Sequence, residues 1–366
     1  MIPWATPSIT ISDEESVRNA LISTWISGGP HHKEFTSNLE NFLEAKNIAL
    51  TNNGTSALAI AFLALGIKPN DKVVVPAFGF MAAANVLLQM NATPVFADVD
   101  PLTWCISRKT LEKVVDKDTK AVVVTHTYGN HHDILEICDY LKSNGNIPLI
   151  EDSAEALGSE IQGSSFGTIG DFGTFSFHAT KLITTGEGGA ITWKNTNASE
   201  MISLIISHGL DRKLHYQHKL PGSNFRMANL NAALGLSQLK RIRSLIDERF
   251  RIDNLYRAML SEAEAAEKFR FQVFGEGKIV PWSFPLKTNL TSREEVHKLV
   301  GILSDLEVEI RPGFATPNYL SYMNSPNFLT YPAAKELSDS LISLPAYPGL
   351  SEKEVVTIVE RVMGVL

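Results

Sequence analysis

The segment 176–190, SFHATKLITTGEGGA, contains a single lysine between short polar residues and a glycine-rich turn. Lys181 is either a surface lysine that precedes a loop or the attachment point of a cofactor. Desolvation and neighbouring positive charge lower the pKa of a lysine, and the neutral amine is a nucleophile that can form a Schiff base. Ser176, at the start of the segment, could donate a hydrogen bond to a cofactor phosphate.

Acidic residues follow the apolar run 147–150. A carboxylate at the end of a buried strand is costly unless it is paired. Asp152 could cap the segment that follows it, or it could pair with the protonated pyridine nitrogen of pyridoxal phosphate, an electron sink that needs such a partner. Glu155 is expected one helical turn further on and could face the same ring. Phe80 is either a core aromatic or a ring that stacks on the cofactor.

The polar stretch NNGTS, residues 52–56, is a candidate phosphate site. Gly54, Thr55 and Ser56 lie where a helix is expected to begin, and the free N–H groups and dipole of a helix N-terminus favour a phosphate. Such residues also serve as helix caps, so the stretch alone leaves both interpretations open. Neither this stretch nor TTGEGG continues into the Gly-Lys-Ser/Thr of a Walker loop, which argues against a nucleoside triphosphatase.

The composition is that of a globular protein. The chain has 366 residues, typical of about two domains, with 44% apolar and 20% charged residues. Its net charge of −7 argues against nucleic acid as a partner. Cys105 and Cys138 form no CxxC pair and are expected to be reduced thiols. We find no signal-peptide pattern and no apolar run of the ~20 residues that a membrane span needs, so we expect a cytoplasmic protein without membrane contact.

Apolar runs separated by helical segments indicate the fold class. Runs that are continuous rather than alternating are typical of a mostly parallel sheet covered on both faces, and therefore of the α/β class. Ligands bind at the carboxyl ends of the strands in such sheets. The segments expected to meet there are 53–56, 78–80, 126–128, 152–155 and 176–181.

From about residue 241 the pattern changes. A long charged helix over 241–260 would lead to strands within 280–288 and 307–314, with a helix over 292–306 between them and a closing helix after residue 351. We therefore predict an N-terminal arm and large domain over 1–240 and a small α+β domain over 241–366. Ser12 with Glu15, and Ser351 with Glu354, have the spacing of capping boxes.

The order of these features resembles the fold type I pyridoxal-phosphate enzymes, and more narrowly the sugar aminotransferases of the DegT/DnrJ/EryC1/StrS family. The likeness covers nearly the whole chain, and the lysine segment is its most specific part. It is carried by the segments NGTSAL, VVVPAFGF, PVFADVD, EDSAEALGS, GDFGTFSFHATKLITTGEGG, SNFRMANLNAALGLSQLKR, IRPGF and LPAYPGLSEKEV. It implies a large domain with a mostly parallel sheet, a smaller C-terminal α+β domain, and pyridoxal 5'-phosphate as the cofactor.

The resemblance also implies roles for individual residues. Lys181 would bind the cofactor covalently and act as the base in the proton shift, and Asp152 would bind the pyridine nitrogen. Glu155 matches a position where many members have glutamine and some have glutamate. The other implied cofactor contacts are Gly54, Thr55, Ser56 and Ser176 at the phosphate, Phe80 at the ring, and Asn224 at the phosphate in the neighbouring subunit of a homodimer.

Three further residues are candidates for substrate contacts. His178 could assist the proton shift or pack near the phosphate. Arg226 could bind the carboxylate of the amino donor, which suits its planar fork, or form an ion pair at the dimer interface. Arg311 could fix a carboxylate from the small domain, as a fold type I enzyme acting on amino acids alone would require.

The implied reaction is a transamination in two half-reactions. An amino acid, expected to be L-glutamate, would give its amino group to the cofactor, and a nucleotide-linked keto-deoxysugar would then receive it. The likeness is nearest to 4-aminotransferases of GDP-4-keto-6-deoxymannose, so we expect amination at carbon 4 for a surface polysaccharide, such as a lipopolysaccharide O-antigen, or a glycoside. Two rivals are a keto-sugar dehydratase, which in this family has histidine at the Lys181 position, and a cofactor-binding regulator, which would not need the base.

Four histidines have no assigned role. His31, His32, His131 and His132 are expected in exposed loops, where they could touch the sugar or the donor. Adjacent histidines without supporting ligands make a poor metal site, so we expect no metal. The stretch RPGFATPNYL lacks a histidine that is usual in the family, which leaves the sugar specificity open.

Overall fold

The computed structural model describes residues 1–131, 133–211, 216–323 and 331–366. Its largest element is a seven-stranded sheet with the strand order β1-β9-β8-β5-β4-β2-β3. The pairs β2–β3, β2–β4, β4–β5 and β5–β8 are parallel, and β9 is antiparallel to both of its neighbours. The predicted α/β class and mostly parallel sheet are confirmed. The strands are β1 Ile48–Thr51, β2 Lys72–Pro76, β3 Thr93–Ala97, β4 Thr119–Thr125, β5 Leu149–Asp152, β8 Phe172–Ser176 and β9 Gly189–Trp193.

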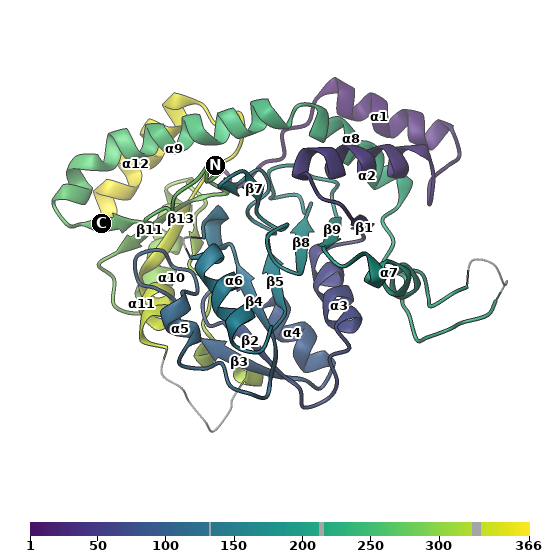
Figure 1. Ribbon diagram of the computed structural model, residues 1–366. Helices are drawn as coiled ribbons and strands as arrows, with labels where there is room; N and C mark the ends of the chain where they lie inside the picture. Colours follow the sequence, from purple (N-terminus) through teal and green to yellow (C-terminus); the bar gives the residue numbers. More distant parts are fainter. Residues whose placement is uncertain (132, 212–215, 324–330) are drawn as a thin grey trace.

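The sheet is buried on both faces, which explains its continuous apolar runs. Along β2, Val73 and Val75 pack into one hydrophobic cluster, while Val74 packs into another. Successive residues of a strand point to opposite faces, so a strand between two cores is apolar at every position. The helices interspersed with these strands are α3 Gly54–Ala64, α4 Ala82–Gln89, α5 Arg108–Leu111, α6 Ile134–Ser143 and α7 Ser199–Ile206 (Figure 1).

Helices α1 Ile11–Ile22 and α2 Pro30–Leu43 pack against α8 Asn229–Lys240 near the β1 edge of the sheet (Figure 1). A small hairpin pairs β6 Glu160–Ile161 with β7 Ser164–Ser165. Short 3₁₀ turns occur at Thr127–Gly129, Thr196–Ala198, Pro317–Tyr319 and Ser321–Met323. Within the described ranges, every helix is too short or too polar to cross a membrane.

A second, antiparallel sheet has the order β10-β11-β13-β12 and its own hydrophobic cluster. Its elements are β10 Phe269–Phe271, β11 Phe284–Thr288, β12 Arg311–Pro312, β13 Leu341–Leu344, α9 Ile242–Ala265, α10 Arg293–Asp305, α11 Pro332–Ser340 and α12 Glu352–Val365. The sequence did not predict β10 or β13. The capping box predicted for α12 is confirmed, since Ser351 N donates to Glu354 Oε2 at 2.8 Å. The domain boundary predicted after residue 240 lies between α8 and α9.

The N-terminal arm lies against this second unit. Ile2 N donates to Glu307 O at 2.7 Å, and Glu309 N donates to Ile2 O at 2.9 Å. Trp4 Nε1 donates to Ser343 Oγ at 3.2 Å, and Ser343 lies in β13 of the second sheet. The arm therefore ties the first residues to the second unit and places Trp4 beside β13.

The capping box predicted for α1 is wrong. The helix is capped by Thr10 instead of Ser12, and Asp13 takes the place expected for Glu15. Thr10 N donates to Asp13 Oδ2 at 2.9 Å. Asp13 is buried and pairs with Arg241 at 2.9 Å, at the end of α8. This contact between distant segments selects the earlier of two adjacent capping patterns.

Candidate active site

A cleft of about 680 Å³ lies between the carboxyl ends of the parallel strands and the second sheet. Thr125, Asp152 and Ser176 are the last residues of β4, β5 and β8, and all three line it. Ser56, Asn224 and Arg226 are not part of its wall. The other residues predicted from the sequence meet there: Gly54, Thr55, Phe80, Asp152, Glu155, Ser176, His178, Lys181 and Arg311.

The start of α3 forms one end of the cleft. Asn53 caps this helix, and its Oδ1 accepts a hydrogen bond from Ser56 N at 2.7 Å. The N–H groups of Gly54 and Thr55 come before that bond, and a helix N-terminus leaves its first N–H groups for a ligand. A Cβ at Gly54 would lie 3.1 Å from Ser176 Cβ, so glycine lets the helix start approach the end of β8. This cradle fits a phosphate group.

Two adjacent carboxylates at the end of β5 serve different purposes. Glu151 is buried and accepts hydrogen bonds from Ile169 N at 2.7 Å and Gly170 N at 2.6 Å. Its carboxylate is therefore engaged by the backbone and not available to a ligand. Asp152 lines the cleft and accepts from Ala154 N at 3.2 Å. Burial raises the pKa of Asp152, and a protonated ring nitrogen beside it would stabilise its charged form. This position fits the nitrogen partner that pyridoxal phosphate requires.

Lys181 lies between a carboxylate and an aromatic ring. Its Nζ is 3.6 Å from Glu155 Oε1 and 3.9 Å from the ring centroid of Trp282. A turn in which Lys181 N donates to His178 O at 2.9 Å directs the backbone at this point. Burial lowers the pKa of Lys181, while the charges of Glu155 and Asp152 oppose that shift. A lower pKa increases the fraction of neutral amine, which is the form that attacks a carbonyl carbon.

Backbone contacts, and not a helix, hold Glu155 beside Lys181. The helical turn that we predicted after Asp152 is wrong, because residues 153–158 form irregular turns. Tyr128 N donates to Glu155 Oε2 at 2.8 Å, and Tyr128 has a left-handed φ of 57°. Burial raises the pKa of Glu155, and the positive charge of Lys181 opposes this shift. The two buried groups therefore stabilise each other's charged forms.

Phe80 and His178 lie at the rim of the cleft. The Phe80 side chain is 64% exposed, and its ring meets that of Phe314 edge-on with centroids 6.4 Å apart. Its exposed face can stack on a planar ligand. His178 Nδ1 is 3.0 Å from Thr180 Oγ1, and its Nε2 is 3.9 Å from Glu187 Oε1.

The two candidate substrate arginines differ in position. Arg226 is exposed outside the cleft wall, and its Nε donates to Asn224 Oδ1 at 3.0 Å. The backbone carbonyl of Asn224 accepts a hydrogen bond from Asn52 Nδ2 at 3.3 Å, beside the start of α3. Arg311 lines the cleft and pairs with Glu309 at 2.5 Å. Of these two arginines, Arg311 is the one that lines the cleft of its own chain.

His131 is not the exposed loop residue that we predicted. Its side chain is fully buried, and its ring centroid is 5.3 Å from that of His126. The segment after β4 folds inward because Asn130 Nδ2 donates to Val273 O at 3.0 Å, which covers the loop with the chain that follows β10.

The other histidines also differ from expectation. His31 and His32 are half-buried in the first turn of α2, so their assignment to an exposed loop is wrong; the Pro30 that precedes them starts the helix. His132 lies outside the described residues. Over the part of the chain that the structure describes, no group of three or more His, Cys, Asp and Glu could hold a metal ion.

Several cleft residues were not identified from the sequence. Trp4, Trp282, Arg293 and Phe314 all line the wall formed by the arm and the second unit. The ring of Tyr128 stacks on Trp282 with centroids 6.1 Å apart and on Phe314 with centroids 5.3 Å apart. Each of these four is a single residue in a segment without characteristic spacing. For Trp282 and Phe314 the sequence offered one signal, an aromatic residue close to a proline in VPWSF and RPGF.

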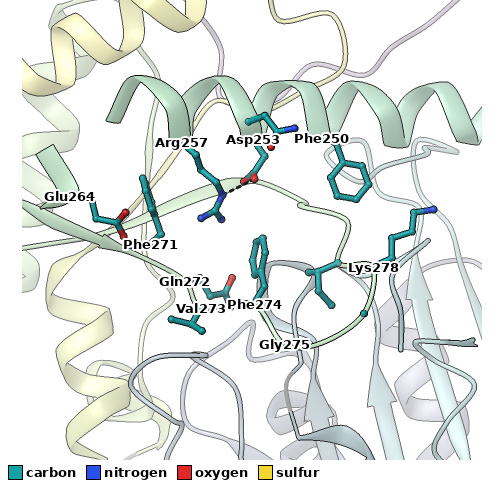
Figure 2. A pocket seen from close by; sticks show the side chains of 13 residues that line it. Phe250, Asp253, Arg257, Glu264, Phe271, Gln272, Val273, Phe274, Gly275 and Lys278 are labelled. Carbon is teal, nitrogen blue, oxygen red and sulfur yellow. Dashed lines mark hydrogen bonds and ion pairs between the residues drawn. The ribbon is translucent and has the colours of Figure 1, made fainter. Parts of the chain in front are cut away.

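A second groove, of about 790 Å³, lies between α9 and the segment 271–279 (Figure 2). Figure 2 shows Arg257 extending from α9 into it, with its Nε donating to Asp253 Oδ2 at 2.7 Å. The guanidinium is also 4.9 Å from the ring centroids of both Phe271 and Phe274. Arg257 is therefore already paired with Asp253. None of the site residues predicted from the sequence lines this groove, so we assign the candidate active site to the cleft of about 680 Å³ that contains Lys181.

A largely buried lysine beside carboxylates, in the crevice of a mostly parallel sheet that also contains a helix N-terminus, is what the active site of a fold type I pyridoxal-phosphate enzyme requires. The DegT/DnrJ/EryC1/StrS aminotransferase family matches residues 7–363. The chain belongs to this family and is a pyridoxal-phosphate-dependent sugar aminotransferase.

Individual relatives support this assignment. The chain is 35% identical to GDP-perosamine synthase of Escherichia coli O157:H7, over 99% of this chain and 97% of that protein. It is 33% identical to GDP-perosamine synthase of Vibrio cholerae, over 97% and 96%. The sugar aminotransferase fold of Spr1654 from Streptococcus pneumoniae, in its PMP form, matches with a TM-score of 0.92 at 28% identity, over 100% of this chain and 99% of that one. The PLP form of Spr1654 also matches, so the predicted family, fold, enzyme class and cofactor are confirmed.

Proposed function

We propose that this enzyme transfers an amino group from L-glutamate to carbon 4 of a nucleotide-linked keto-deoxysugar of the GDP-4-keto-6-deoxymannose type. The observation that carries the proposal is the similarity to three GDP-perosamine synthases, at 35%, 33% and 32% identity. Lys181 favours transamination over dehydration, because the keto-sugar dehydratases that this family contains have histidine at that position.

The residues of the cleft fit pyridoxal phosphate. In this proposal Lys181 binds the cofactor covalently, Asp152 binds its ring nitrogen, and Phe80 contacts the ring. When bound, the cofactor supplies an electron sink and carries the amino group from donor to acceptor. The proposed phosphate contacts are the N–H groups of Gly54 and Thr55 and the hydroxyl of Ser176, because the N–H of Ser56 already donates to Asn53 Oδ1 at 2.7 Å.

Lys181 also moves the protons of the reaction. In the donor half-reaction its neutral Nζ accepts the proton of the donor α-carbon, and in the acceptor half-reaction it gives a proton to carbon 4 of the sugar. Glu155, 3.6 Å away, balances the ammonium charge while Lys181 holds a proton within each half-reaction. Tyr128, Trp282 and Phe314 form an apolar wall that excludes water and strengthens these electrostatic interactions. His178 and Arg311 both line the cleft. In this proposal His178 assists the proton shift and Arg311 binds a substrate carboxylate.

Replacing Glu155 with glutamine will move the pH profile. The change removes the negative charge that opposes the effect of burial, so the pKa of Lys181 falls further below its ordinary value. Lys181 is a free amine only while substrate is bound, so the neutral amine persists to lower pH in the enzyme–substrate complex and the acid limb of kcat moves to lower pH. Parallel profiles of the wild type and E155Q check this expectation, and an acid limb that stays in place or moves upward contradicts it.

We further propose a homodimer with shared active sites. Asn224 and Arg226 are exposed and outside the wall of their own cleft, as expected for residues that serve a neighbouring subunit. Apolar side chains are also exposed along and after α1: Ile11, Leu21, Ile22, Trp25 and Ile26. Exposed apolar side chains gathered in one segment of the chain are consistent with a protein interface.

Shared sites predict complementation between defective subunits. Each mixed dimer of K181A and N224A chains has one site with both native residues and one site with neither. Randomly mixed subunits are expected to recover about one quarter of the wild-type activity, because half of the dimers are mixed and each has one intact site. Activity after unfolding and remixing measures this, and a mixture no more active than its two components contradicts shared sites.

The substrate proposal is tested in two stages. The absorption spectrum of the purified enzyme should lose its yellow band on addition of L-glutamate, which reports the donor half-reaction. The amine form is then offered nucleotide-linked keto-sugars that differ in the base, the hexose and the keto carbon, and the yellow band should return fastest with the GDP-linked 4-keto-6-deoxymannose compound. A yellow enzyme that glutamate leaves unchanged would reject the proposed donor, and recovery with 3-keto sugars alone would reject carbon 4.

The cellular role follows from the proposed reaction. We propose that the domains divide after residue 240 and that the enzyme acts in the cytoplasm, supplying an amino sugar for a surface polysaccharide such as a lipopolysaccharide O-antigen or for a glycoside. Cys105 and Cys138 are free thiols, and burial raises the pKa of Cys105 to about 12. Unpaired, unreactive cysteines fit a reducing compartment.

A further inference from the structure

Trp282 contacts the reactive amine of Lys181. The Lys181 Nζ lies 3.9 Å from the centroid of the Trp282 ring. An indole face attracts a cation within about 6 Å of its centroid, and it does so more strongly than the rings of tyrosine or phenylalanine. Trp282 is 9% exposed, so water does little to weaken the attraction.

Three contacts hold Trp282 in place, two of its indole and one of its backbone. Its Nε1 donates to Thr180 O at 2.9 Å, in the residue before the lysine. The backbone carbonyl of Trp282 accepts a hydrogen bond from Arg249 Nη1 at 2.5 Å. Its ring stacks on Tyr128, with an interplanar angle of 19°. Trp282 therefore cannot turn away from Lys181 without breaking contacts with the lysine loop and the large sheet.

Charged groups face Lys181 from three elements. Glu155, after β5, is 3.6 Å from its Nζ, and Asp152 at the end of β5 adds a second negative charge. Arg249 in α9 is buried, and its positive charge disfavours an ammonium group nearby. An ammonium has three N–H donors and no acceptor, so one carboxylate contact leaves part of its surface to other partners. The face of Trp282 covers that remaining part.

We propose that the face of Trp282 and the carboxylate of Glu155 form the resting position of the Lys181 ammonium group whenever this lysine is not bonded to the cofactor. The proposal rests on the role proposed for Lys181 above. During each half-reaction the substrate nitrogen takes the place of Lys181, which must stay close enough to move a proton. Attraction to a ring face depends weakly on rotation about the Cε–Nζ bond, so the amine can turn toward its target while it stays in place. Trp282 is thus a positioning residue.

The test measures the protonation of Lys181 without using the reaction. The full chain, free of cofactor, is reductively methylated with isotope-labelled formaldehyde, and the Lys181 signal is identified by its absence from K181A. It is titrated by NMR in the wild type, W282L, W282F and the control W104F. Trp104 is a matched control because it is buried and meets Tyr128 edge-on at 6.2 Å, but it is not part of the cleft wall.

Loss of the indole face disfavours the charged form, so the protonation constant of Lys181 should fall about three- to thirtyfold in W282L. The fall should be smaller in W282F and absent in W104F. The kcat of transamination should fall in the same order, while the KM values of both substrates stay within about twofold, because the lysine and not the substrate loses its support.

Other outcomes overturn the proposal. A protonation constant that is unchanged or raised in W282L removes the basis for a cation site on the ring. An equal fall in W104F would mean that looser packing around Tyr128 explains the effect. A raised KM with an unchanged kcat would make Trp282 a substrate contact instead. If W282L does not fold, W282F compared with W104F decides the question. Because the titration needs no substrate, its failure is distinct from failure of the proposed aminotransferase reaction.

Discussion

Replacing Lys181 with arginine will lower the kcat of transamination by at least about ten-thousandfold. Arginine keeps the positive charge and can still pair with Glu155, which lies 3.6 Å from the lysine Nζ. Its guanidinium does not deprotonate in proteins, so it can neither attack the cofactor aldehyde nor exchange the substrate proton. The absorption spectrum should lack the yellow band of the wild type, and a coupled assay for the amino sugar measures the rate.

A second lysine provides the control for K181R. Lys72 pairs with Asp116 at 2.8 Å on the outer part of the sheet, and neither residue lines the cleft. K72R should keep the yellow band and nearly the full rate. If K181R retained more than about 1% of the wild-type kcat, Lys181 could not be the essential base.

Replacing Asp152 with asparagine is expected to reduce kcat by about a hundred- to a thousandfold, comparable to the loss of one strong electrostatic contact in an active site. Asparagine has nearly the same size and can still accept a hydrogen bond from Ala154 N, which is 3.2 Å from Asp152 Oδ1. It lacks the negative charge that keeps a ring nitrogen protonated, and the protonated ring is the better electron sink. The rate is measured at saturating cofactor, with occupancy followed by absorbance.

Asp171 is the matched control for Asp152. Its Oδ2 accepts a hydrogen bond from Leu149 N at 2.9 Å, at the opposite end of β5 from the cleft. D171N removes a carboxylate from the same pair of strands without altering the site, so kcat should be close to that of the wild type. If extra cofactor restored D152N to full activity, Asp152 would contribute to binding alone and not to the chemistry.

The side of the site formed by the large sheet could be predicted because its residues stand at or directly after the ends of the strands. The apolar runs before Asp152 and Ser176 mark the ends of β5 and β8, and these strands are parallel neighbours. Parallel pairing places such ends at one edge of the sheet, so residues far apart in the sequence meet without any knowledge of side-chain contacts. The same reasoning places Gly54 and Lys181 in the cleft.

The opposite side depends on contacts that no local pattern encodes. Trp282 and Arg293 line the cleft from the second unit, whose sheet pairs its strands in the order β10-β11-β13-β12 and not in the order of the chain. Our prediction for α1 failed for a similar reason, since a buried ion pair from Asp13 to α8 selects its cap. His131 lies on a polar stretch that reads as a loop, but a hydrogen bond from its neighbour Asn130 to Val273 draws it inward.

The N-terminal arm also determines when the cleft is completed during synthesis. Trp4 is translated 339 positions before Ser343, whose hydroxyl accepts a hydrogen bond from its indole. Ile2 likewise forms its β-bridge with Val308, which is translated much later. Contacts between distant residues form slowly because a long loop must close, and translation supplies the C-terminal partner last. The side of the cleft that contains Trp4 therefore cannot close during synthesis until Ser343 has been translated.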